Sequence, residues 1–191
     1  MGFPNKKYIS EQKYLEKERE AFEKSEYFQG EIFAMSCASE EHNIISMNCS
    51  ADLRFKLKGK KCRPYGSGMR MNIPENTLYT YPYLSVYCNE IETLDDQFDT
   101  AKKPTIIFEI LSKSTRNYDL GQKFELYREI PTLKEYILID SERIKVIVNP
   151  KISDTTWSFT EFYSINDSFE IKSIEISMNL VDIYEDVIFD K

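Results

Sequence analysis

The chain has 191 residues, of which 41% are hydrophobic and 30% are charged, and it carries a formal net charge of −7. It is large enough for one hydrophobic core and too small for two, so we predict a single domain over residues 1–191. No run of about 18 apolar residues is present, which excludes a membrane-spanning helix. The overall acidity argues against non-specific coating of nucleic acid, although a local basic patch could still contact phosphates.

The cysteines and the N-terminus set an expectation about the compartment. The four cysteines, at positions 37, 49, 62 and 88, lack the paired spacing of a zinc site. His42 is the single histidine, which excludes a multi-histidine metal site. The first residues, MGFPNKKYIS, lack the apolar core of a signal peptide. We therefore expect a cytoplasmic protein with reduced thiols and no membrane association.

The N-terminal third predicts two helices separated by a hairpin. The first helix begins after a Ser10 cap and ends near residue 24, and the hairpin turns at Gln29-Gly30. Glu31 follows the turn directly, where an exposed position and a role at a site explain it equally well. The second helix runs from a Ser39 cap to about residue 57.

The second helix carries an inward stripe at helical spacing that consists of His42, Ile45, Cys49 and Leu53. His42 lies in the first turn, where the positive end of the helix dipole favours the neutral imidazole. A structural role and a role at a site both remain open for it.

A group of cations follows at the end of this helix: Arg54, Lys56, Lys58, Lys60, Lys61 and Arg63. They fit either a solvated helix end, whose dipole they complement, or contact with phosphates. If the protein binds DNA, the candidate phosphate contacts are Lys58, Lys60, Lys61 and Arg63.

Strands are expected at residues 62–65, 69–73 and 79–89, before a charged loop over residues 93–103. In the C-terminal part of the chain, an antiparallel pair of strands is expected at residues 136–139 and 144–148. Further strands near residues 157–159 and 169–176 and a closing helix near residues 180–187 complete the chain.

The stretch from residue 104 to residue 140 carries the candidate chemistry. Glu109 interrupts an apolar run, IIFEIL, that is typical of a buried strand. An ionised carboxylate that is buried without a partner costs about 3–5 kcal/mol of stability. A cation, a metal ion or hydrogen-bond donors in contact with it reduce this cost. Asp119, Lys123 and Tyr127 recur every fourth residue, so they share one face of the following helix. An acid on the strand beside a helix lysine is a geometry that can hold a divalent cation, but it is as often a structural ion pair.

The sequence FEILSKSTRNYDLGQKFELYREIPTLKEYILID resembles the signature of the Uma-two family of putative restriction endonucleases, within the PD-(D/E)xK nuclease superfamily. The likeness extends over nearly the whole chain and includes EYFQGEIFAMS, the EHN at residues 41–43, YTYPYLSVYC and LVDIYEDVIF. It implies a fold that contains both helices and strands (α/β in the broad sense, and α+β because the sheet is mixed). In this fold a central mixed sheet is flanked by helices. The likeness also implies hydrolysis of DNA phosphodiesters assisted by Mg²⁺ or Mn²⁺.

The resemblance assigns roles residue by residue. Glu109 matches the metal-binding acid on the long strand, and Lys123 matches the family's catalytic lysine. His42 matches a catalytic position, and Glu31 matches a second metal-ligand position near the site. Asp119 and Tyr127 are supporting residues. In such a site the metal lowers the pKa of an attacking water, and a lysine balances the developing negative charge.

The chain departs from the family pattern at two acid positions. Tyr83 stands where the family has an aspartate after a proline, and Gly68 stands where the family usually has another aspartate. A neutral tyrosine is a poor Mg²⁺ ligand, and glycine offers no side-chain ligand. Asp119 or Glu31 could substitute in part. We therefore expect metal binding to be weak or absent.

Three interpretations remain open at this point. The chain is a metal-dependent DNA endonuclease of this family, with full or weakened activity, or an inactive family member that serves as a DNA-binding or protein-interaction module. In the third interpretation the Glu109–Lys123 pair is only a buried ion pair. A homodimer is expected by analogy with nucleases that cut both strands.

Overall fold

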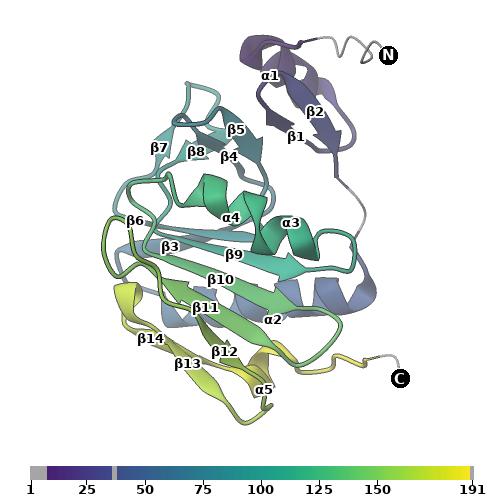
Figure 1. Ribbon diagram of the computed structural model, residues 1–191. Coiled ribbons are helices and arrows are strands. Elements are labelled where there is room, and N and C mark those ends of the chain that lie inside the picture. The colour runs from purple at the N-terminus through teal and green to yellow at the C-terminus, as the bar shows by residue number, and fades with distance from the viewer. Residues whose placement is uncertain (1–7, 36–37, 190–191) are drawn as a thin grey trace.

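The computed structural model describes residues 8–35 and 38–189 (Figure 1). One sheet contains β1 (Ser25–Phe28), β2 (Glu31–Ala34), β4 (Arg70–Ile73), β5 (Leu78–Thr80), β7 (Glu92–Thr93) and β8 (Thr100–Lys102). Its strand order is β2-β1-β5-β4-β8-β7.

The second sheet contains β3 (Cys62–Gly66), β6 (Leu84–Cys88), β9 (Ile106–Leu111), β10 (Glu135–Asp140), β11 (Val146–Pro150) and β12 (Thr160–Phe162). Its strand order is β12-β11-β10-β9-β6-β3. A two-stranded ribbon pairs β13 (Ser168–Ile171) with β14 (Ile176–Asn179). The helices are α1 (Glu11–Glu20), α2 (Glu40–Lys56), α3 (Arg116–Leu120), α4 (Gln122–Tyr127), the 3₁₀ turn η1 (Lys172–Ile174) and α5 (Leu180–Ile183).

Strand β9 lies in the interior of the second sheet, and every one of its residues is buried. It runs parallel to β10, with Glu109 opposite Leu138, and antiparallel to β6. A strand that is covered on both faces has apolar residues at nearly every position, which explains the apolar residues around Glu109. The predicted mixed sheet flanked by helices is confirmed.

Helices cover both faces of this second sheet. Helix α2 lies across one face, and α3 and α4 lie on the other (Figure 1). The α2 stripe predicted from the sequence is buried against the sheet: His42, Ile45, Cys49 and Leu53. Ser39 caps the helix as predicted, because its hydroxyl accepts a hydrogen bond from the His42 N–H at 3.4 Å.

The N-terminal hairpin belongs to the first sheet and packs under α1. Tyr27 stacks on Tyr14 with ring centroids 5.0 Å apart, and Tyr79 of β5 completes this small cluster. Gln29 and Gly30 have φ angles of 47° and 91°, the left-handed conformation that a tight hairpin turn requires. The predicted hairpin is therefore confirmed, although α1 ends at Glu20, earlier than expected.

Several predicted elements differ from the structure. The strand expected near residues 157–159 is β12, at Thr160–Phe162, and Trp157 makes only an isolated bridge to Lys151. The strand expected at residues 169–176 is the ribbon of β13 and β14, joined by η1 and separate from the large sheets, and the closing helix ends at Ile183.

The strand expected at residues 79–89 divides into β5 and β6, because the chain leaves one sheet and enters the other around Pro82, which has no N–H to donate. The charged loop at residues 93–103 contributes the short strands β7 and β8. The helix that carries Lys123 is two short helices, α3 and α4, which meet at Gly121.

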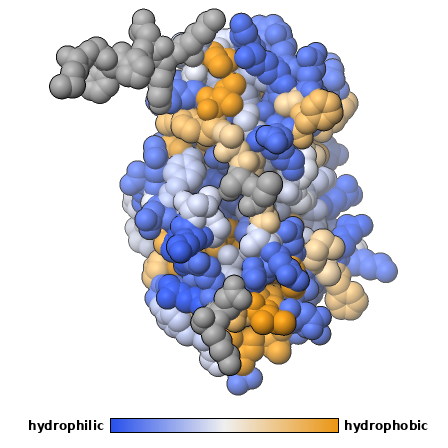
Figure 2. Space-filling model, turned by 90° about the vertical axis from the view of Figure 1, so that its right-hand side faces the viewer, coloured by the Kyte–Doolittle hydropathy of each residue, from blue (hydrophilic) through white to orange (hydrophobic). Residues whose placement is uncertain are grey.

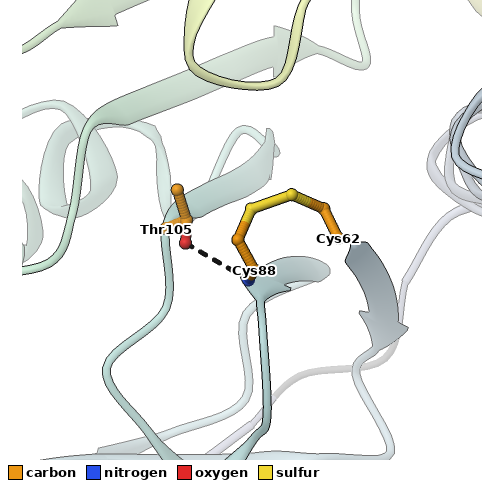
Figure 3. The surroundings of a disulfide bond; sticks show 3 residues. All are labelled: Cys62, Cys88 and Thr105. Carbon is orange, nitrogen blue, oxygen red and sulfur yellow. Dashed lines mark hydrogen bonds between the residues drawn. A yellow bond between two sulfur atoms is a disulfide. The ribbon is translucent and has the colours of Figure 1, made fainter. Parts of the chain in front are cut away.

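The expectation of reduced thiols is wrong for two of the cysteines. Cys62 on β3 and Cys88 on β6 lie directly opposite each other in the antiparallel pair and form a disulfide (Figure 3). The Cys88 N–H donates a hydrogen bond to the Thr105 hydroxyl at 3.4 Å. Cys49 is a buried free thiol, and Cys37 lies outside the described residues. Cysteine spacing missed the bridge because it does not reveal which strands pair.

Reduction of this disulfide is expected to lower the free energy of unfolding by about 3 kcal/mol, because a bridge that closes a long loop limits the entropy of the unfolded chain. The two cysteines are 26 residues apart in sequence. Urea denaturation with and without dithiothreitol measures the effect. A Cys62→Ser/Cys88→Ser variant is the control and should not respond to the reductant. An unchanged midpoint for the reduced wild-type protein would contradict the prediction.

No helix within the described parts of the chain is both long enough and apolar enough to cross a membrane.

Candidate functional site

A cavity of about 1030 Å³ lies where β9 ends and α2 begins. Its lining combines side chains from β1, α2, β9, α3 and α4 with the residues that join β5 to β6. The charged and aromatic side chains of the lining include Glu26, His42, Tyr83, Glu109, Asp119 and Lys123. Figure 2 shows the molecule from this side, where hydrophilic residues are interspersed with apolar ones.

Lys123 is the centre of the charge arrangement in this cavity. Its ammonium nitrogen Nζ lies 2.9 Å from Glu109 Oε1, 3.1 Å from Glu26 Oε1 and 3.6 Å from Asp119 Oδ1. The residue is only 6% exposed and Glu109 only 2%. One buried cation therefore contacts three carboxyl groups that come from β9, β1 and α3.

Hydroxyl groups hold two of these acids in place. The Tyr127 hydroxyl donates a hydrogen bond to Glu109 Oε1 at 2.7 Å. The Thr80 hydroxyl donates to Glu26 Oε1. Charge-assisted hydrogen bonds of this kind are about twice as strong as neutral ones, so the carboxylates are fixed in orientation.

Burial and charge act in opposite directions on the ionisation of this cluster. Burial raises the pKa of Glu109, the Lys123 ammonium lowers it, and the negative charge of Asp119 raises it again, with a net upward shift. Burial alone would lower the pKa of Lys123, but Glu109, Tyr127 and the other two acids raise it well above its usual value. Burial also raises the pKa of Asp119. Lys123 is therefore charged at neutral pH, and the cluster binds protons more tightly than separate acids would.

Tyr83 occupies the side of the cavity next to Glu109. Its backbone N–H donates to Glu109 Oε2 at 3.4 Å, and its ring lies edge-on to His42 with centroids 4.0 Å apart. Burial, followed by the charge of Glu109, raises the pKa of Tyr83 to about 12. The phenol is consequently neutral at pH 7.

His42 is a buried neutral imidazole at the N-terminus of α2. It is 2% exposed, and its Nδ1 atom has no hydrogen-bond partner among the described residues. Burial lowers the pKa of His42 to about 4. The imidazole is therefore uncharged over the physiological range.

Acid is expected to destabilise the protein through His42. The unfolded chain binds a proton at the usual pKa of about 6.5, whereas the folded protein resists protonation down to about pH 4. The free energy of unfolding should therefore fall as the pH drops through this window, by about 2 kcal/mol at about pH 5. Urea titrations of the wild type and His42→Gln at about pH 7.5 and about pH 5 test this. The stability difference between the two proteins should change by that amount, and a constant difference would contradict the prediction.

Some of the predicted site residues lie together, and others lie elsewhere. Glu109, Lys123 and Asp119 are in direct contact, Tyr127 bonds to Glu109, and His42 lies against Tyr83. Glu31 pairs with Phe28 next to the hairpin turn, and the cavity lining contains Glu26 instead. Gly68 is in the turn between β3 and β4, and a Cβ atom there would meet nothing within 4 Å.

The predicted phosphate-contact residues are at the other end of α2: Lys58, Lys60, Lys61 and Arg63. The helix has 17 residues, so about 25 Å of helix separates this basic cluster from the first turn of α2 at the cavity.

Two features of the site were not predicted from the sequence. Glu26 is on β1, on the face of the strand opposite the buried Tyr27, where an acid normally faces solvent. Only the folding of the hairpin over the cavity brings Glu26 to Lys123. Arg116, at the start of α3, donates to both carboxylate oxygens of the buried Asp140 at the end of β10. That pair fixes α3, the helix that precedes Lys123, to the C-terminal end of β10.

The residues in the cavity do not fit a two-acid metal site. Within residues 8–35 and 38–189, no three His, Cys, Asp or Glu side chains are placed to hold one metal ion. The phenol of Tyr83 lies beside Glu109 and is neutral, and a neutral phenol is a poor ligand for a hard cation. The Lys123 ammonium lies among the carboxylates that remain and neutralises part of their charge.

Comparisons with known proteins agree with the fold and the motifs. The model of the Uma2 family, described as "Putative restriction endonuclease", matches residues 11–180. Two uncharacterized proteins of Synechocystis, sll1609 and slr1290, are each 35% identical to the chain. The first alignment covers 89% of this chain and 96% of the relative, and the second covers 95% and 94%.

A crystal structure described as "a putative nuclease belonging to DUF820", from Anabaena variabilis, has a TM-score of 0.75 to this structure. It is 16% identical in sequence, and the superposition covers 94% of this chain and 99% of that chain. This likeness shows a shared fold. Since the family model spans most of the chain and both relatives align over nearly their whole length, the chain belongs to the Uma2 family of restriction-endonuclease-like proteins.

Proposed function

We propose that this protein is a DNA-binding member of the restriction-endonuclease-like nucleases whose metal-dependent hydrolysis of phosphodiesters is strongly impaired. The observation that carries the proposal is the place of Tyr83 beside Glu109, with a neutral phenol where an acid ligand is expected. Restriction-endonuclease-like families typically use divalent metal ions. With one acid absent and Lys123 among the others, the affinity for Mg²⁺ or Mn²⁺ is low.

The remaining residues keep the positions that the family's chemistry would use. Glu109 is the acid that would face a metal ion, Lys123 is the cation that would balance charge on a phosphate, and His42 borders the same cavity. Asp119 and Tyr127 orient Lys123 and Glu109 through the contacts described above. In this proposal Glu26 takes the place near the site that the resemblance gave to Glu31 as a metal-ligand candidate.

DNA is the proposed partner because the family and the structural neighbour are nuclease-like. The net charge of −7 works against phosphate binding, so the affinity must come from local cations. The basic cluster of Lys58, Lys60, Lys61 and Arg63 is the candidate.

The experiment measures binding and cleavage separately. Fluorescence anisotropy of a labelled duplex should show binding that weakens as salt is raised, and a Lys60→Ala/Lys61→Ala variant should bind less tightly with a shallower salt dependence. Supercoiled plasmid incubated with the wild type and Mg²⁺ or Mn²⁺ should remain uncut. Cleavage by the wild type that is lost in Glu109→Gln would overturn the impaired-hydrolysis proposal in favour of an active endonuclease. The absence of DNA binding at low salt would overturn the DNA-binding proposal.

A further inference from the structure

Helix α2 has an apolar stripe on the face that points away from the sheet. Met47 is 69% exposed and Phe55 is 79% exposed, and Ala51 between them is also exposed. The spacing of four residues places these side chains on one side of the helix. The opposite side of α2 is the one that packs on the second sheet, so the outer stripe has no part in that core.

Opposite charges stand at the two ends of this stripe. Glu40 is exposed at the first position of α2, and Lys58 is exposed just beyond its last turn. Glu40 is about two turns of 3.6 residues from Met47, so the two share one side of the helix. Lys58 follows the C-cap Leu57, and its N–H donates to the Phe55 carbonyl at 3.2 Å, which keeps it close to the Phe55 end of the stripe. Arg54 is also exposed on this side. Among the ion pairs of the described residues, none includes Glu40, Arg54 or Lys58.

We propose that this face of α2 binds α2 of a second copy of the chain in an antiparallel, two-fold arrangement. With the axis midway between residues 47 and 51, Met47 packs against the partner's Ala51. Glu40 then faces the partner's Lys58, and Lys58 faces the partner's Glu40. The small Ala51 side chain lets the helix axes approach to about 8–10 Å.

The charges select this orientation. A parallel arrangement would place Glu40 beside the partner's Glu40 and Lys58 beside the partner's Lys58, which is repulsive at both ends. In the antiparallel arrangement both ends are attractive, and the same patch serves both subunits, as an isologous interface requires. The face is self-complementary in charge and in the placement of large and small side chains.

The size of the face limits the strength of the dimer. One helix packed on another buries an area at the low end of specific interfaces, below about 1,200 Å² in total. We therefore expect a dissociation constant in the micromolar range that increases with salt, since the end pairs are exposed to solvent.

Sedimentation equilibrium of the full chain without DNA, from about 2 to 300 µM, tests the proposal. The wild type should dimerise, and Met47→Glu/Phe55→Glu should be monomeric at every concentration. Glu40→Lys and Lys58→Glu should each raise the dissociation constant about tenfold or more, and the double variant that carries both should return to within about threefold of the wild type. Phe98→Glu, at a loop residue that is 69% exposed, is the matched control and should behave like the wild type.

A wild type that stays monomeric to the highest concentration would overturn the proposal, as would a dimer that persists in Met47→Glu/Phe55→Glu. A dimer that each charge reversal weakens but that the double reversal does not restore would overturn the antiparallel arrangement.

Discussion

Replacement of Lys123 by methionine is expected to lower the free energy of unfolding by about 3–5 kcal/mol near neutral pH, because it leaves a buried carboxylate without its cation. Lys123 is the partner of three acids, and both it and Glu109 are buried. Methionine has a similar length and no charge, so the loss would report the charge and not a cavity. Urea denaturation measures the change.

The loss should depend on pH with a definite sign. Without Lys123, the pKa of Glu109 rises further, because burial and Asp119 both raise it and the main opposing charge is gone. A folded-state pKa above the unfolded value adds stability at low pH, and this stability is lost as the pH rises through the folded pKa. The deficit of Lys123→Met should therefore be larger at about pH 8 than at about pH 5.

Two variants complete this test. Lys113→Met removes an exposed lysine at the rim of the same cavity and should change the stability by less than about 0.5 kcal/mol. Lys123→Met/Glu109→Gln removes the charge from both partners and should recover part of the loss, which gives a coupling energy for the pair. If the losses in Lys123→Met and in Glu109→Gln alone add up to the loss in the double variant and do not depend on pH, the two side chains are not an ion pair.

Replacement of Tyr83 by aspartate is expected to create metal-dependent plasmid cleavage at least about a hundredfold above the wild type, since one more metal-bound charge in such a site is worth several kcal/mol. The backbone of Tyr83 already hydrogen-bonds to Glu109, so a carboxylate at this position would stand next to the existing acid. Conversion of supercoiled plasmid to nicked and linear forms with Mn²⁺ measures the gain.

The controls separate the effect of the added carboxylate from the effect of losing the aromatic ring. Tyr83→Phe removes the hydroxyl but keeps the packing on His42, and it should not cleave. Tyr83→Asp/Glu109→Gln should lose the gained activity. Gly68→Asp alone should remain inactive, because position 68 lies in a turn and is absent from the cavity lining. If Gly68→Asp cleaves plasmid as well as Tyr83→Asp does, the assignment of the missing acid to position 83 is wrong.

The sequence predicts the centre of the site but not its whole surroundings. Glu109 in an apolar strand and Lys123 in the helical segment that follows are close in sequence, so local patterning already brings them together. Asp119 and Tyr127 follow from the same four-residue spacing. Glu26 could not be predicted in this way, because it comes from a different sheet and its position in the strand is that of an ordinary exposed acid.

The same limit explains the errors in the fold. Helix α2 was predicted nearly to its ends because a serine cap and an apolar stripe are local signals. The division of residues 79–89 into β5 and β6 depends on which sheet each half joins, and the disulfide depends on the pairing of β3 with β6. Both are properties of the tertiary arrangement, which hydrophobic periodicity does not encode.

Impaired metal binding is tested most directly by the binding of Mn²⁺ to the wild-type protein, measured through the electron paramagnetic resonance signal of the free ion. We expect no site with a dissociation constant below about 1 mM in the wild type, and one site per chain in Tyr83→Asp. One tightly bound Mn²⁺ per wild-type chain, lost in Glu109→Gln, would contradict this expectation, because a divalent ion would then bind beside Lys123 without the missing acid.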